Sequence, residues 1–148
     1  MSARVREAEA SDATAILGLV QAHAAFEREV APLSLHELHT ILSADSPPTR
    51  LLVADGDTAP VGYAAVTFDF SLWRGRPYGH LDCLFVAASA RGRGNGKQLF
   101  DAVVKLARAE GVDRLEWQTP SWNTDAIRFY LQTGALGVSK QRFAIPLR

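Results

Sequence analysis

The apolar positions of this chain follow two different periods. Helical spacing runs through residues 11–26, 34–42, 97–111 and 124–133. Short runs rich in β-branched and aromatic residues lie around Val5 and over residues 51–53, 61–70, 80–86, 115–118 and 141–147, and such runs are typical of strands. Helices and strands therefore alternate, with two hairpin connections, and this order favours an α/β (α+β mixed) sheet over a helical bundle or a β-sandwich.

Several residues mark where these elements begin and end. Ser34, followed three residues later by Glu37, predicts a capping box at the start of the second helix. The dipeptide Asp55-Gly56 provides turn chemistry between two strands, which we expect to pair as a hairpin. The apolar run over residues 80–86 indicates a strand buried on both faces, so we expect it near the centre of the sheet.

The chain has 148 residues, 47% of them hydrophobic and 22% charged, as expected for one globular domain over residues 1–148. Sixteen basic and sixteen acidic residues balance, which argues against nucleic acid or an anionic membrane as a partner. The single cysteine, Cys83, cannot form an internal disulfide, so we expect a reducing, cytoplasmic location. No run of apolar residues is long enough to cross a membrane.

The most informative stretch is Arg91-Gly92-Arg93-Gly94-Asn95-Gly96-Lys97, between an apolar strand and an amphipathic helix. Glycines allow close approach of the backbone to a ligand, and amide groups at a helix N-terminus favour a phosphate. Neither the nucleotide P-loop nor the dinucleotide fingerprint matches the positions of these glycines. The alternative interpretation is a flexible basic turn without a ligand.

At these residues the chain resembles the GNAT superfamily of N-acetyltransferases, whose loop reads Gln or Arg, two residues, Gly, one residue, Gly or Ala. Arg91, Gly94 and Gly96 match that pattern. The resemblance covers nearly the whole chain and is closest to the diamine acetyltransferase branch. Two further stretches carry it: Leu81-Asp82-Cys83-Leu84-Phe85-Val86, and Trp122-Asn123-Thr124-Asp125-Ala126-Ile127-Arg128-Phe129-Tyr130 with Gly134-Ala135 after it.

The resemblance implies a twisted, mostly antiparallel mixed sheet with helices on both faces and a V-shaped split between the two central strands. Acetyl-CoA would lie in that split, its pyrophosphate on the loop residues Arg91, Gly92, Arg93, Gly94, Asn95, Gly96 and Lys97. Its pantetheine arm would pair with the backbone of Leu84, Phe85 and Val86 as an added strand. Asn123 would lie near the pantetheine, although an Asn at this position is also a normal helix cap.

Acetyl transfer to an alkyl amine requires a base, because such an amine is mostly protonated at neutral pH. Asp82 is the first candidate, since it occupies the position where the diamine branch has Glu. Strict strand alternation would place it opposite Cys83 and on the same face as His80, the alternative base and a candidate acceptor contact. Both polar residues also fit a solvated strand end, and Cys83 is interpreted as a core thiol.

The resemblance also implies a proton donor and an acceptor groove. Tyr130 falls at the tyrosine that protonates the leaving sulfur, although it also fits an apolar helix stripe. Glu27 and Trp73 align with groove residues, and Trp73 equally fits a core or dimer contact. The diamine branch has an acid where this chain has Ser71, so we expect a less acidic groove and a small mono- or diamine or an amino-acid-like amine as acceptor.

The predicted function is therefore transfer of an acetyl group from acetyl-CoA to a primary amine of a small molecule. Two alternatives stay open: a protein or peptide N-acetyltransferase, and a non-catalytic acyl-CoA sensor. His36 and His39 have a spacing used in metal sites but lack further ligands, so no metal is expected. The family resemblance suggests a homodimer.

Overall fold

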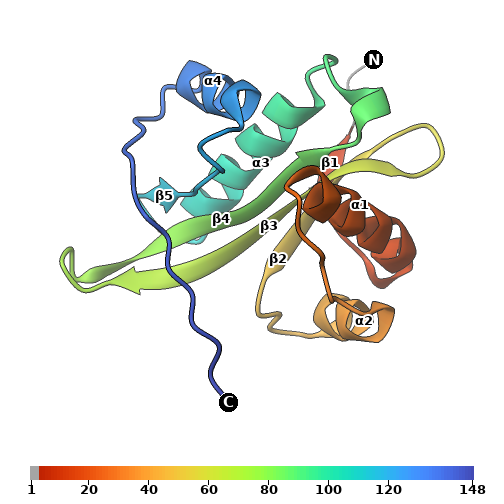
Figure 1. The fold of residues 1–148 in the computed structure, drawn as a ribbon. Helices are drawn as coiled ribbons and strands as arrows, with labels where there is room; N and C mark the ends of the chain where they lie inside the picture. Colours follow the sequence, from red (N-terminus) through yellow and green to blue (C-terminus); the bar gives the residue numbers. More distant parts are fainter. Residues whose placement is uncertain (1–3) are drawn as a thin grey trace. The chain divides into compact units, whose positions relative to one another are not determined.

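The computed structural model describes residues 4–148, which fall into two compact units with a boundary between Gln118 and Thr119. Figure 1 shows the elements of each unit. The first unit contains β1 (Val5–Glu7), the 3-10 turn η1 (Ala10–Asp12), α1 (Ala13–Phe26), α2 (Leu35–Ser43), β2 (Arg50–Asp55), β3 (Pro60–Ser71), β4 (Arg76–Val86), the 3-10 turn η2 (Ala88–Ala90), α3 (Asn95–Ala109) and β5 (Leu115–Glu116). The second unit contains α4 (Thr124–Gln132).

The sheet has five strands in the order β1-β2-β3-β4-β5. The first four pair antiparallel, and β4 pairs with β5 in parallel. This confirms the predicted mixed, mostly antiparallel sheet. The parallel pairing is short. Among the described residues it joins only Gly79 to Leu115 and His80 to Glu116, and beyond these residues β4 and β5 do not pair with each other.

Local sequence signals fix the ends of the helices. The Ser34 side chain accepts a hydrogen bond from Glu37 N, and the Glu37 side chain accepts one from Ser34 N, so the predicted capping box of α2 is confirmed. Helix α3 starts at Asn95, two residues earlier than predicted, because Gly94 adopts a φ of 83° and ends the preceding loop.

Helices pack on both faces of the sheet in the first unit. On one face, α1 and α2 bury Ile16 and Leu38 against Val53, Tyr63 and Phe85. On the other face, α3 contributes a buried stripe of Leu99, Phe100, Val103 and Ala107. A Cβ added at Gly62 would lie 3.0 Å from Leu99 Cδ1 and 2.9 Å from Phe85 O, so only glycine permits this close approach of α3 to β3.

Arg6 joins three parts of the first unit. Its guanidinium contacts both carboxylate oxygens of Asp12 at 2.8 and 2.9 Å and both of Asp55 at 2.9 and 3.0 Å. Asp12 is only 7% exposed, and its hydrogen bonds with Arg6 hold the pKa of its carboxyl below the ordinary value. Through these two carboxylates Arg6 connects β1 to the start of α1 and to the end of β2.

The predicted strand over residues 141–147 is wrong. In the structure residues 135–148 form no helix or strand, and Phe143, Ile145 and Leu147 are 88%, 78% and 87% exposed. A strand requires a partner to satisfy its backbone groups, and α4 is the one regular element of the second unit. Pro146 also lacks the N–H that a ladder needs. As a result β5, also shorter than predicted, is an edge strand.

Among the helices within residues 4–148, none combines the length and apolar character needed to span a bilayer.

We expect Arg6→Leu to lower the free energy of unfolding by about 3 kcal/mol at neutral pH, because it leaves the Asp12 carboxylate buried without its partner. The lowered pKa of Asp12 contributes stability that is complete above its ordinary value of 3.8 and is lost as pH falls through the folded-state value. The difference between the two proteins, measured by urea denaturation, should therefore shrink in acid.

Arg114→Leu is the matched control, since Arg114 pairs with Glu116 at the surface, where each side chain is about half exposed. Its removal should cost less than about 1 kcal/mol. Equal losses for the two variants would contradict the structural role assigned to Arg6.

Candidate active site

The arginine-glycine loop leads from the end of β4 into the first turn of α3. Gly92 and Gly94 adopt φ values of 76° and 83°, a backbone conformation that favours glycine. A Cβ added at either glycine would meet no atom within 4 Å, so the space above both residues is open. The two glycines are therefore required by backbone geometry, and they leave room for a ligand.

The amide groups of this loop are available for an anion. At the two ends of the loop, Arg91 N donates to Ala88 O and Gln98 N donates to Gly94 O. Within residues 4–148, no hydrogen bond uses the N–H groups of residues 92–97. Unpaired amides at the N-terminus of a fifteen-residue helix are well suited to bind a phosphate.

The polar side chains of the loop have different roles. Arg91 Nε donates to Val86 O at 2.9 Å, and its guanidinium lies 5.1 Å from the Phe26 ring and 5.3 Å from the Phe85 ring. Lys97 pairs with Asp101 at 2.7 Å, whereas Arg93 has no hydrogen bond or ion pair within the described part of the chain. Asn95 is buried, and its Nδ2 donates to Ala90 O at 3.0 Å, so its side chain holds η2 against α3.

Beside this loop, one edge of β4 has no strand partner among the described residues, and there the Val86 carbonyl accepts from Arg91 Nε. Ala87 N donates to Val61 O, and Gly62 is the partner of Val86, so the alternation of an antiparallel ladder pairs Phe85 with Tyr63 through hydrogen bonds. The N–H and C=O groups of Leu84 and Val86 then point to the opposite edge. No strand among residues 4–148 pairs with that edge beyond His80.

Asp82 lies in a β-bulge. Cys83 pairs with Ala65 and Leu81 pairs with Val66, so Asp82 is the extra residue of β4. The bulge breaks the alternation on which the predicted placement opposite Cys83 depended. Cys83 Sγ is 3.7 Å from Asp82 Oδ2, and the Asp82 side chain is exposed.

The groups beside Asp82 are protonated at neutral pH. Burial, with a contribution from the Asp82 charge, raises the pKa of the Cys83 thiol to about 12. Burial also raises the pKa of Tyr63, which is 2% exposed, far above its ordinary value. The charges of Asp82 and Glu27 raise both values further, which indicates that the two carboxylates lie near these groups. A neutral thiol fits the interpretation of Cys83 as a core residue.

His23 and Tyr63 connect to the candidate residue Glu27 through contacts that the sequence did not predict. His23 Nδ1 lies 2.7 Å from Tyr63 Oη, and His23 Nε2 lies 2.9 Å from Glu27 Oε2. The imidazole also stacks on Phe85, with ring centroids 5.0 Å apart. The spacing of four residues between His23, in the last turn of α1, and Glu27, the residue after that helix, was a usable signal, whereas the contact with Tyr63 depends on the packing of α1 on the sheet.

The remaining predicted residues of the first unit lie apart from this cluster. His80 Nδ1 is 3.4 Å from Thr67 Oγ1. Trp73 is 99% exposed in the turn between β3 and β4, at the other end of the hairpin from Phe85 (Figure 1). Ten residues of β4 span roughly 30 Å, so Trp73 and Glu27 do not meet within one chain.

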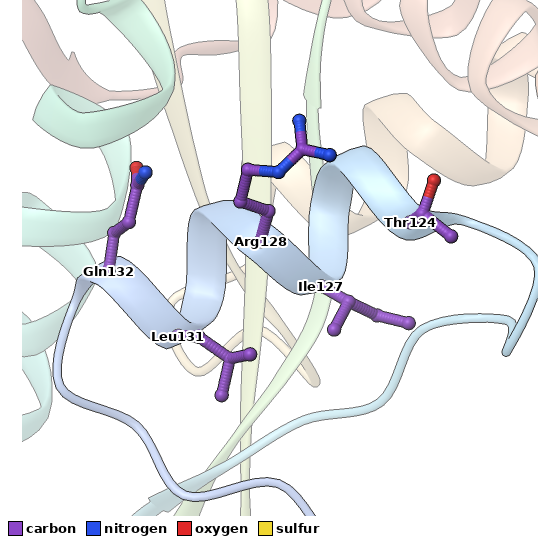
Figure 2. A pocket seen from close by; sticks show the side chains of 5 residues that line it. All are labelled: Thr124, Ile127, Arg128, Leu131 and Gln132. Atoms are coloured by element: carbon purple, nitrogen blue, oxygen red, sulfur yellow. The ribbon is translucent and has the colours of Figure 1, made fainter.

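Asn123 and Tyr130 belong to the second unit. Asn123 caps α4, because its Oδ1 accepts from Ala126 N at 3.4 Å, as the alternative interpretation of this residue predicted. Tyr130 lies on α4 beside Phe129, with ring centroids 5.3 Å apart. A hollow of about 440 Å³ follows the same helix and is lined by Thr124, Ile127, Arg128, Leu131 and Gln132 (Figure 2). None of the predicted site residues lines it.

Comparison with known proteins gives the same assignment as the loop. The family model described as Acetyltransferase (GNAT) family matches residues 16–135. The chain belongs to this family. The loop of residues 91–97 and the open edge of β4 are therefore parts of an acetyl-CoA-dependent N-acetyltransferase, in which the co-substrate supplies the acetyl group.

Curated relatives act on small amines. The thialysine N-epsilon-acetyltransferase of Bos taurus is 29% identical over 141 residues, which cover 88% of this chain and 82% of that protein. The L-ornithine N5-acetyltransferase NATA1 of Arabidopsis thaliana is 43% identical over 56 residues, which cover 38% of this chain and 25% of that protein. These similarities are consistent with the diamine acetyltransferase-like branch.

The fold also matches solved structures. An aminoglycoside acetyltransferase from an uncultured soil metagenomic sample superimposes with a TM-score of 0.81 at 18% identity, covering 98% of this chain and 96% of that one. This likeness confirms the GNAT fold.

If the loop amides bind the pyrophosphate, Gly94→Glu should weaken acetyl-CoA binding at least tenfold, because it places a side chain and a negative charge beside them. Isothermal titration calorimetry with acetyl-CoA measures the effect.

Gly111→Glu is the matched control. Gly111 has a φ of 84°, and a Cβ there also meets no atom within 4 Å, so the backbone strain is the same as at Gly94. It follows the far end of α3. Equal weakening by both variants, or undiminished binding by Gly94→Glu, would contradict the assignment of the loop.

Proposed function

We propose that this chain transfers the acetyl group to a primary amine of a small diamine or an amino acid with an amino side chain. The observation that carries the proposal is a pair of carboxylates at the two ends of one set of contacts. Glu27 Oε2 lies 2.9 Å from His23, whose other ring nitrogen lies 2.7 Å from Tyr63 Oη. Asp82 Oδ2 lies 3.7 Å from the thiol of Cys83, which packs against the core cluster that contains Tyr63. An ammonium group is attracted to such a pair, and a small molecule with two amino groups can use both.

The relatives support this choice of acceptor. Two of them are named for thialysine and ornithine, which are amino acids with an amine at the end of the side chain. A long polyamine is a poorer candidate, because Ser71 and Cys83 stand where the diamine branch has acids. A homodimer and a cytoplasmic location stay predictions.

Asp82 is the proposed base. The bulge exposes its carboxylate at the open edge of β4, where the amine must lose a proton before it attacks the thioester carbonyl. The N–H of Leu84, directed to the same edge, is the proposed donor to the carbonyl oxygen as negative charge develops. His80 stays the alternative base.

The proposed acetyl-CoA site combines the loop with this edge. The pyrophosphate is placed on the amides of residues 92–97 with Arg93, and the pantetheine on the backbone of Leu84 and Val86. The backbone groups of Phe85 pair with Tyr63, so the proposed contribution of Phe85 to the acetyl-CoA site is its buried side chain. Asn123 is proposed beside the pantetheine, and Tyr130 as the donor that protonates the departing thiolate.

Assays with acetyl-CoA and a panel of acceptors test the proposal. Diamines and diamino acids such as ornithine and thialysine should give kcat/KM values at least tenfold above those of peptides with a free N-terminus or lysine. A preference for peptides would favour a protein N-acetyltransferase. Tight acetyl-CoA binding without transfer to any amine would indicate a sensor.

We expect Tyr130→Phe to lower kcat by about 100-fold, because a general acid contributes that much or more, while the Kd for acetyl-CoA stays within a factor of two. Tyr78→Phe is the control, since the Tyr78 hydroxyl lies 3.4 Å from the surface residue Asp69 on the β3–β4 hairpin. An unchanged kcat for Tyr130→Phe would remove Tyr130 from the mechanism.

A further inference from the structure

His23 has a defined set of partners on every side. Its ring stacks on Phe85 with an interplanar angle of 18°, one nitrogen contacts the buried Tyr63 hydroxyl, and the other contacts the Glu27 carboxylate. The His23 side chain is 15% exposed and that of Glu27 is 30% exposed. The imidazole therefore lies between the core and a carboxylate that solvent and ligands can reach.

The chemistry of these partners determines which nitrogen carries the proton in the neutral ring. A carboxylate only accepts hydrogen bonds, so the short contact with Glu27 requires an N–H at Nε2. Nδ1 is then an acceptor, and the phenol of Tyr63 is its donor. Each contact fixes the other, so the hydroxyl of Tyr63 holds the ring in the orientation in which Nε2–H faces Glu27.

Glu27 needs such a support because of its position in the chain. It follows the last residue of α1, and the next residue, Arg28, has a φ of 62°, where the helix has ended. A carboxylate at a helix end has several rotamers, and a hydrogen bond from a stacked ring selects one of them.

We propose that His23 is a positioning residue for the acceptor: its Nε2–H holds the Glu27 carboxylate as the anchor for the second, non-reacting ammonium group of a diamine or diamino acid. This inference rests on the proposed function, in which Asp82 receives the proton of the reacting amine. Glu27 then binds the non-reacting ammonium group and Asp82 takes the proton of the reacting amine. His23 acts only through Glu27.

The experiment compares a diamine with the monoamine of the same chain length, since only the diamine has the second ammonium group. Binding of each amine in the presence of CoA is measured by calorimetry, and kcat and KM are measured with acetyl-CoA. His23→Leu should weaken diamine binding and raise its KM about tenfold, with kcat and the constants for the monoamine within threefold of the wild type. His23→Gln, which restores an N–H donor, should recover most of the loss.

Two further variants separate positioning from packing. Glu27→Gln should remove the preference for the diamine, and the double variant His23→Leu/Glu27→Gln should bind the diamine no more weakly than Glu27→Gln alone. Tyr63→Phe should cause a smaller loss in the same direction, about threefold, and it tests the inference even if His23→Leu does not fold. His39→Leu, a loss of an exposed imidazole on α2, should change nothing.

The outcomes separate this inference from the proposed function. A wild-type chain that binds the diamine but transfers no acetyl group would contradict the proposed function and leave the role of His23 standing. Acetyl transfer with an unchanged diamine preference in His23→Leu and Tyr63→Phe, additive losses in the double variant, or no binding of the diamine by the wild type would overturn the inference.

Discussion

The site depends on a strand pairing that stops early. Strand β4 pairs with β3 along its length except at Asp82, the extra residue of the bulge, whereas β5 pairs only with Gly79 and His80 among the described residues. Beyond them, no strand in the described part of the chain pairs with the outward backbone groups of Leu84 and Val86. The loop follows directly, and its amides at residues 92–97 have no hydrogen-bond partner among residues 4–148. A thioester carrier can use both features at once, because its pantetheine resembles a strand and its pyrophosphate is an anion.

The bulge at Asp82 connects this edge with the acceptor side. In a strand without a bulge, side chains alternate between the two faces, and Asp82 and Cys83 would point in opposite directions. With the bulge, the carboxylate lies close to the thiol. Tyr63 and His23 then extend the polar contacts to Glu27, the residue that follows α1.

Much of this arrangement could be predicted from the sequence. The glycine pattern of residues 91–97 predicts a loop of unusual backbone geometry, because the positive φ values at Gly92 and Gly94 are a requirement of those single residues. Phosphate binding by this loop stays a prediction. The capping box of Ser34 is local in the same way. The bulge, the contacts of His23 with Tyr63 and Phe85, and the separation of Trp73 from Glu27 were not predictable, because each depends on strand register or on packing between distant segments. The prediction of a strand over residues 141–147 was wrong for a related reason. An alternating pattern does not show whether a neighbouring strand is present to pair with it.

An unpaired strand edge is also a place where another protein molecule can add a strand and start aggregation. Two features of β4 lower that risk. The bulge at Asp82 interrupts the regular spacing that a foreign strand would need, and Arg91 occupies the carbonyl of Val86 while it stacks on Phe26 and Phe85. The hydrogen bond of Arg91 thus leaves the Val86 carbonyl less available to a foreign strand.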